Sequence, residues 1–498
     1  MSVQGSLAAT LASRVYLALL ALVMLPVYLH RLGPEAYGLI ALFMVLQVWF
    51  QLLDVGLTPT LARETARHRA GALSAADLRQ LLRALEGLFG LLALAAGAAL
   101  FLGAGFVAAH WLNVEQLPPN EVVLCVQLMA LCMALRLLGE LYRGVITGFE
   151  RFAWLAGTQA AFGTLRLVAV LPFMAWAGGS PTHFFGFQLL AIAAETALLM
   201  AQAYRLAPRA GLASPRWSLA PVRGVLSFSL AMSMASVVWV TLSQVDKLLL
   251  SGLLSLADYG AFSLAAVAAS AVLLVSGSLA EVLMPRLTQL QAQGSGQAVQ
   301  ALYSRATQWA GMAAWSLACV LAVFAERVLW VWTGDAALAA KAGPVLGLYA
   351  LGNAALAVGA FPFYLQFAQG RLRLHLVGTA LMVGVLLPAM VWATARSGAA
   401  GAAGVWLGVN VLYLLLWTPV AHARFLPGGH FRWMTRDVLP IAAMAALMAW
   451  ACQVLPWPAG RVAGGCMLLG AGTLVLLASA AGSSWARSVW RRPTVVGA

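Results

Sequence analysis

One apolar segment of the chain opens with Leu32-Gly33-Pro34-Glu35-Ala36-Tyr37-Gly38-Leu39, and a later one opens with Leu254-Ser255-Leu256-Ala257-Asp258-Tyr259-Gly260-Ala261. The two Tyr-Gly pairs are 222 residues apart. A second pair of similar stretches, Thr147-Gly148-Phe149-Glu150-Arg151 and Gln369-Gly370-Arg371-Leu372-Arg373, has its glycines and its final arginines at the same offset of 222 residues. Two matches at one offset predict an internal duplication.

The composition places this duplication in a membrane. Of the 498 residues, 62% are apolar and 9% are charged, whereas soluble domains are about 45–50% apolar and about 25% charged. A helix that crosses the hydrocarbon needs roughly 20 mostly apolar residues. Segments of that kind predict fourteen transmembrane helices, near residues 11–31, 36–57, 84–106, 122–142, 153–176, 184–204, 224–246, 259–284, 308–329, 343–366, 375–395, 402–423, 437–455 and 461–481.

The offset of the repeat corresponds to six spans, and repeats with an even number of spans keep one orientation in the membrane. We therefore expect an all-α polytopic membrane protein with two pseudo-symmetric six-helix lobes around a midplane cavity, followed by two C-terminal helices. That architecture indicates transport. The polar stretch 58–83 is predicted to be an amphipathic interfacial helix. The predicted parts are an N-terminal lobe 1–204, an inter-lobe loop 205–223, a C-terminal lobe 224–423, a final helix pair with its loop 424–481, and a tail 482–498.

The distribution of basic residues predicts the orientation. The segment before the first span, the loops after even-numbered spans and the tail hold 22 of the 30 basic residues, and the opposite side holds six. Because cytoplasmic loops carry an excess of Lys and Arg, both termini are expected in the cytoplasm. The net charge of +14 is spread over these loops, so it does not indicate a nucleic-acid partner.

The sequence offers little for covalent chemistry. A phosphate-binding P-loop needs Gly-Lys followed by Ser or Thr, and neither Lys247 nor Lys341 follows a glycine. The histidines are isolated, and the cysteines lack metal-ligand spacing. We therefore expect a transporter rather than an enzyme, with no catalytic residue, no metal site and no cofactor.

Three stretches resemble a known family. The run from Leu32-Gly33-Pro34-Glu35 through Leu53-Asp54-Val55-Gly56-Leu57 to Leu61-Ala62-Arg63-Glu64 is similar to the start of Wzx-type oligosaccharide flippases. These polysaccharide biosynthesis proteins belong to the multidrug/oligosaccharidyl-lipid/polysaccharide (MOP) exporter superfamily. The stretch Tyr142-Arg143-Gly144 to Arg151-Phe152 resembles the loop after the fourth span of that family, and Gln244-Val245-Asp246-Lys247 resembles the opening of its second lobe.

The resemblance implies a flippase that moves a polyprenyl-pyrophosphate-linked oligosaccharide, an O-antigen or exopolysaccharide repeat unit, across the bacterial inner membrane by alternating access. Its expected partners are this glycolipid, membrane lipids, a polysaccharide polymerase and chain-length proteins. Three alternatives stay open: a lipid II flippase, a cation-coupled multidrug exporter of the same superfamily, and a non-transporting scaffold of a polysaccharide synthase complex.

Ionisable residues inside spans are candidates for function because burying a charge in the bilayer is costly. Arg166 and Glu195 lie about 19 Å and about 16 Å along consecutive antiparallel spans, at 1.5 Å per residue. Matching depths predict an ion pair between them. It either neutralises two buried charges or works in transport, with Arg166 meeting the pyrophosphate or sugar and Glu195 releasing it on protonation.

Four other charges are weaker candidates. Arg136 and Glu140 share one face of the fourth span, four residues apart, and either form an intrahelical pair or an entry point for the substrate headgroup. Asp54 closes the second span, and Asp246 lies at the outer end of the seventh. With Glu195, these two carboxylates are candidates for ion coupling or gating, while contacts between lobes are an equal explanation for Asp54.

Overall fold

The computed structural model describes residues 3–208, 229, 233, 237, 240, 241, 243–484 and 486. Within these residues the chain is helical, and its only β-type pairing is an isolated bridge between Asn113 and Ser255. It divides into two compact units, Met1–Gly260 and Ala261–Ala498.

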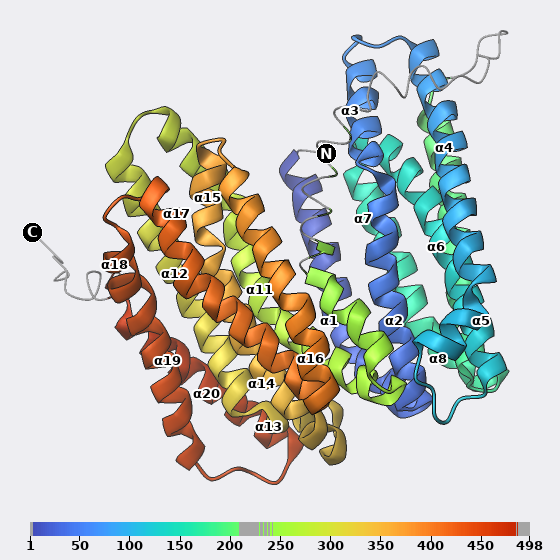
Figure 1. Ribbon diagram of the computed structural model, residues 1–498. Helices are drawn as coiled ribbons and strands as arrows, with labels where there is room; N and C mark the ends of the chain where they lie inside the picture. Colours follow the sequence, from blue (N-terminus) through green and yellow to red (C-terminus); the bar gives the residue numbers. More distant parts are fainter. Residues whose placement is uncertain are drawn as a thin grey trace, which may run out of the picture. The chain divides into compact units, whose positions relative to one another are not determined.

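The helices of the first unit run alongside one another (Figure 1), and α6 packs against α3, α4 and α9. Their bounds are α1 Val3–Leu32, α2 Pro34–Gln51, η1 Leu52–Asp54, α3 Leu57–Arg69, α4 Ala75–Leu102, α5 Ala104–Phe106, η2 Val107–Trp111, α6 Pro119–Gly148, α7 Phe152–Thr164, η3 Leu165–Ala169, α8 Val170–Ala177 and α9 Pro181–Leu206. The next named helix, α11, Leu256–Ala292, begins in the last residues of this unit.

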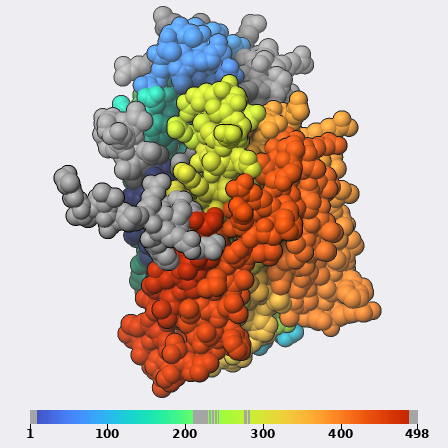
Figure 2. Space-filling model, turned by 90° about the vertical axis from the view of Figure 1, so that its left-hand side faces the viewer, coloured from blue at the N-terminus to red at the C-terminus, as the bar shows by residue number. Residues whose placement is uncertain are grey.

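In the second unit, α12 packs against α14, α19 and α20. Figure 2 shows a face on which the orange and red segments from α16 to α20 form much of the surface. The bounds are α12 Gly296–Val323, α13 Ala325–Thr333, α14 Ala336–Gly359, α15 Phe361–Ala368, α16 Arg373–Leu412, η4 Tyr413–Trp417, α17 Thr418–Phe425, α18 His430–Trp433, η5 Met434–Val438, α19 Leu439–Ala451, η6 Cys452–Val454 and α20 Arg461–Gly482.

Twelve segments of the described chain are long and apolar enough to cross a membrane. One of them, Arg373–Phe425, contains two predicted spans, 375–395 and 402–423, separated where the backbone leaves helical geometry at Ser397 and Gly398. The predicted span 224–246, the loop 205–223 and the tail 482–498 lie largely outside the described residues. Exposed apolar side chains such as Leu94, Leu469 and Val462, which are 70%, 74% and 84% exposed, mark helix faces suited to lipid rather than water.

The prediction of one amphipathic helix over 58–83 is wrong. Helix α3 ends at Arg69, and Gly71 follows with a φ of +79°, which favours glycine. Ser74 then caps a new helix, because its Oγ accepts the backbone N–H of Asp77. The second half of the stretch is therefore the first part of α4, whose Leu78, Leu81 and Leu82 are buried in the core of the first unit.

The two Tyr-Gly motifs of the repeat lie against each other within the first unit. A Cβ on Gly38 would overlap the backbone oxygen of Leu256, and one on Gly260 would lie 2.8 Å from the backbone oxygen of Pro34. Glu35 in the same motif is 3% exposed, and its carboxylate accepts backbone N–H bonds of 2.8–3.0 Å from Glu115, Gln116 and Leu117. The motif thus packs α2 against the start of α11 and anchors the loop before α6.

The second match of the repeat has a different register from the one predicted. After α6 the left-handed residue is Glu150, with φ +56°, and after α15 it is Gly370, with φ +67°. In both turns the following N–H bonds back to a carbonyl five residues earlier, from Arg151 to Ile146 and from Arg371 to Gln366. Equivalent turns are therefore 220 residues apart, and Gly148 does not correspond to Gly370.

Candidate functional site

A cluster of five charged side chains lies inside the first unit, on three membrane-spanning segments. Arg136, Glu140 and Arg143 come from α6, Arg166 from the π-helical turn η3, and Glu195 from α9. Arg166 and Glu195 each lie fourteen residues after the start of their span, at Phe152 and Pro181. Their equal depth allows the two side chains to meet, as the sequence predicts.

Glu195 forms the centre of the cluster. Its side chain is 6% exposed, and its Oε2 lies 2.7 Å from Nη1 of Arg166. Its Oε1 lies 3.2 Å from Nη2 of Arg143. The predicted Arg166–Glu195 ion pair is therefore present, and each carboxylate oxygen of Glu195 contacts a different arginine.

The π-helical turn at η3 positions Arg166. Such single wide turns interrupt the regular α-helical bonding and are frequent at functional sites. The carbonyl of Arg166 accepts a bond of 3.0 Å from Nε2 of Gln188, a buried residue of α9. Gln188 therefore ties the turn to the helix that carries Glu195.

The partner of Glu140 differs from the one considered at the sequence level. Its Oε1 lies 3.3 Å from Nη1 of Arg143, and no ion pair or hydrogen bond joins Arg136 to another side chain in the described part of the chain. Three arginines and two glutamates give the cluster a formal charge of +1. Within the described residues, Arg136 is the one cation of the cluster that lacks an ion pair.

Arg136 faces a small cavity. Its volume is about 20 Å³, which is enough for a water molecule but not for a pyrophosphate. The cavity lies among side chains of α2 and α6, and it would have to widen before a pyrophosphate could bind Arg136 within it. Its lining residues are Gln47, Phe50, Gln51, Met133, Arg136, Leu137 and Glu140.

Asp54 and Asp246 have local partners. Asp54 Oδ1 accepts the N–H and the hydroxyl of Thr58, at 2.9 Å and 2.7 Å, and so caps the start of α3. Asp246 is fully buried and lies 3.3 Å from Nζ of Lys247. The capping bonds give Asp54 a structural role, and roles in coupling or gating stay predictions for both. Among the described residues, no three His, Cys, Asp or Glu side chains gather as a metal site would require.

Sequence reasoning missed Arg143, which it assigned to a loop. Helix α6 continues to Gly148, so Arg143 is a helical residue seven positions after Arg136. A spacing of seven returns to the same helix face. The pattern Arg136, Glu140, Arg143 was the available indication.

Comparison with known proteins identifies relatives of this chain. The family model described as "Polysaccharide biosynthesis protein" matches residues 3–291, which is more than half of the chain. A putative O-antigen transporter from Shigella flexneri is 27% identical over 121 residues, a match that covers 24% of this chain and 28% of that protein. The chain thus matches less than a third of the length of that relative.

Two solved structures have similar folds. A lipid II flippase, MurJ in an inward closed conformation, gives a TM-score of 0.74 at 14% identity, covering 98% of this chain and 99% of that one. An inward-facing multidrug resistance MATE family transporter of the MOP superfamily gives a TM-score of 0.66 at 15% identity, covering 82% and 94%. At these identities the likeness concerns the fold alone.

Proposed function

Because this chain belongs to the polysaccharide biosynthesis protein family, we propose that it is a flippase which moves a polyprenyl-pyrophosphate-linked oligosaccharide across the bacterial inner membrane by alternating access. The fold of MOP-superfamily transporters and the partial match to an O-antigen transporter support a transporter rather than an enzyme. The proposal includes fourteen spans, two six-helix lobes with a C-terminal helix pair, and both termini in the cytoplasm.

The observation that carries the proposal is the cluster around Glu195. Three arginines inside apolar helices are costly in a bilayer, and two glutamates leave one positive charge uncompensated. A pyrophosphate is a strong acceptor for arginine, which binds phosphate oxygens through paired N–H groups. A substrate that carries this group would complete the charge balance of the cluster.

The geometry suggests an order of events. In the structure Glu195 holds Arg143 and Arg166 together, at 3.2 Å and 2.7 Å. The pyrophosphate competes with Glu195 for these arginines once α2 and α6 separate at Arg136. Release follows when the ionised Glu195 carboxylate takes back Arg143 and Arg166, because only its charged form competes with a pyrophosphate for arginines. Shielding of the headgroup by these cations replaces the hydration that it would lose in bare hydrocarbon.

Reconstitution tests the activity directly. Purified chain in proteoliposomes should expose a fluorescent lipid-linked oligosaccharide to an outside quencher or glycosidase faster than empty vesicles do. If the pure chain transports no glycolipid, the result favours the alternative of a non-transporting scaffold. If it exports a fluorescent drug along an ion gradient instead, the multidrug exporter is the better assignment.

Variants of Arg166 test the site. Arg166→Gln should lower transport at least tenfold, and Arg166→Lys should retain part of it, because lysine keeps the charge but loses the paired N–H geometry. Arg205→Gln, an exposed arginine at the end of α9, is the matched control and should transport normally. Full transport by Arg166→Gln at normal protein levels would remove the cluster from the mechanism.

A further inference from the structure

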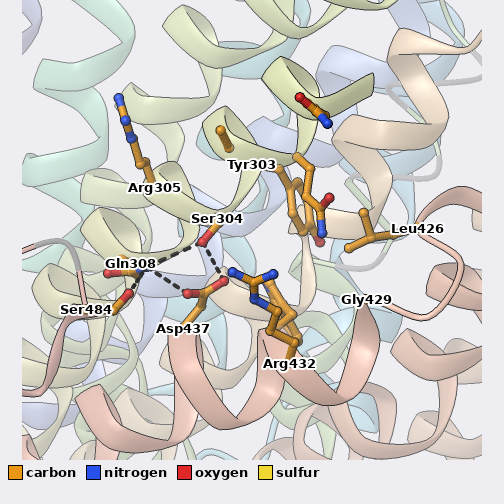
Figure 3. A pocket seen from close by; sticks show the side chains of 13 residues that line it. Tyr303, Ser304, Arg305, Gln308, Leu426, Gly429, Arg432, Asp437 and Ser484 are labelled. Atoms are coloured by element: carbon orange, nitrogen blue, oxygen red, sulfur yellow. Dashed lines mark hydrogen bonds between the residues drawn. The ribbon is translucent and has the colours of Figure 1, made fainter. Parts of the chain in front are cut away.

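The second unit contains a pocket that the proposed function does not use. Its volume is about 360 Å³, eighteen times that of the cavity at Arg136. Its wall comes from the first turns of α12, from the segment between α17 and α19, and from Ser484 beyond α20 (Figure 3). The starts of two candidate spans and the end of a third, Gly296–Val323, His430–Val454 and Arg461–Gly482, meet here. The pocket therefore lies where membrane gives way to water.

Among the described residues of the wall, Asp437 is the only acidic one, and neutral side chains donate hydrogen bonds to it. Ser304 Oγ donates to one oxygen and Gln308 Nε2 to the other, both at 2.7 Å. Gln308 is itself held by Ser484 at 2.9 Å and Ser483 at 2.6 Å. Asp437 is 6% exposed, so this network forms a fixed polar floor. Figure 3 marks the bonds among Ser304, Gln308, Asp437 and Ser484 with dashed lines.

Two arginines in the wall stay available for an anion. Arg432 lies beside Asp437 in Figure 3, and Arg305 extends away from the hydrogen-bonded network. Neither forms an ion pair or a hydrogen bond with another described side chain. With Asp437 they give the wall a formal charge of +1. Gln297 and Gln300 on α12 add neutral donors.

The aromatic side of the pocket is rigid. Tyr303 and Trp433 are 1% and 2% exposed and stack with ring centres 6.3 Å apart. Tyr303 shares a hydrogen bond of 2.8 Å with His422, and Trp433 donates to Thr307 at 3.0 Å. A ligand would therefore enter a preformed recess rather than create one.

We propose that this pocket binds the phosphate headgroup of an anionic phospholipid from the adjoining leaflet. The location at the membrane boundary favours a lipid over a soluble anion, because acyl chains can stay in the bilayer while the phosphate reaches Arg305 and Arg432. Exposed apolar residues next to the pocket, Phe431 at 78% and Leu439 at 51%, provide a surface for those chains. The site differs from the cluster around Glu195 and does not depend on the proposed transport.

Lipid retention tests the proposal. The full chain, purified in detergent, is incubated with mixed micelles of phosphatidylglycerol or of phosphatidylcholine, and bound lipid is counted by native mass spectrometry. We expect phosphatidylglycerol to be retained preferentially. Arg305→Gln/Arg432→Gln should weaken retention by about fivefold for each arginine. Arg371→Gln, an exposed arginine of the same unit outside the pocket, should retain the lipid normally.

A second variant separates loss of charge from loss of space. Ala301→Trp places a large side chain in the pocket from an exposed helical position, keeps every charge and should also reduce retention. Equal retention by the double arginine variant and the parent would overturn the proposal. Displacement of phosphatidylglycerol by millimolar inorganic phosphate would overturn the lipid assignment and make the site one for soluble phosphate.

Discussion

Replacement of Glu195 by glutamine isolates the contribution of the buried charge cluster. Glutamine keeps the size of the side chain but removes the negative charge that Arg143 and Arg166 share, so the formal charge of the cluster rises from +1 to +2. Removal of one partner from a buried ion pair costs about 3–5 kcal/mol. Because Arg166 and Arg143 are 17% and 24% exposed, we reduce this figure for solvent screening, to about 2 kcal/mol.

The assay is thermal unfolding of the purified chain in detergent. For a unit of this size, about 2 kcal/mol corresponds to a fall in the unfolding midpoint of about 4–8 °C. The chain supplies a matched control, because Glu150 forms an ion pair of similar length, 2.8 Å, with Arg69, and its side chain is 64% exposed. Glu150→Gln should lower the midpoint by less than about 2 °C.

The double variant Arg166→Gln/Glu195→Gln restores the formal charge to +1 and should recover part of the lost stability. A positive coupling energy between the two positions is the quantitative expectation. The reasoning fails if Glu195→Gln is no less stable than Glu150→Gln, since the buried carboxylate would then contribute no more than a surface one.

Three further outcomes follow from the packing and the caps. Gly148→Ala should prevent accumulation of folded protein, because its Cβ would lie 2.5 Å from the carbonyl oxygen of Ala62. Gly157→Ala, which has open space around it, should express normally. Equal yields of the two variants in fluorescence-detected gel filtration would contradict the close α3–α6 packing. Glu35→Ala should make the loop around Gln116 several times more sensitive to protease, because three backbone N–H groups lose their acceptor. Glu115→Ala serves as the control. An unchanged cleavage rate in Glu35→Ala would show that contacts other than those of Glu35 hold the loop. Asp54→Asn keeps the acceptor for Thr58 and should preserve both stability and transport. Asp54→Ala should lower the free energy of unfolding by about 1 kcal/mol. Loss of transport in a fully stable Asp54→Asn variant would instead assign Asp54 to ion coupling.

The sequence predicted most features that depend on the length of apolar segments and on the depth of charged residues within them. Apolar stretches indicated the spans, and equal depth indicated the Arg166–Glu195 pair. The family resemblance was confirmed by the family match over residues 3–291, and one of its motifs includes Gly38, which packs closely against Leu256.

What the sequence did not predict depends on local backbone geometry. The break at Gly71 depends on a single left-handed residue. The role of Arg143 depends on where α6 ends, and helix ends are the least predictable feature of a periodic pattern. The pocket at Arg432 joins residues from distant parts of the chain, so no local pattern could indicate it.

The ion pair between η3 and α9 also bears on biogenesis. Arg166 emerges from the ribosome 29 residues before Glu195, and a lone arginine at the centre of a nascent span carries an insertion penalty of about 2.5–3.5 kcal/mol. The carboxylate that neutralises it is on the next candidate span to be synthesised, Pro181–Leu206. The Arg166–Glu195 pair lowers this penalty when the two spans enter the lipid together, so we expect the hairpin to insert more readily than the span with Arg166 alone.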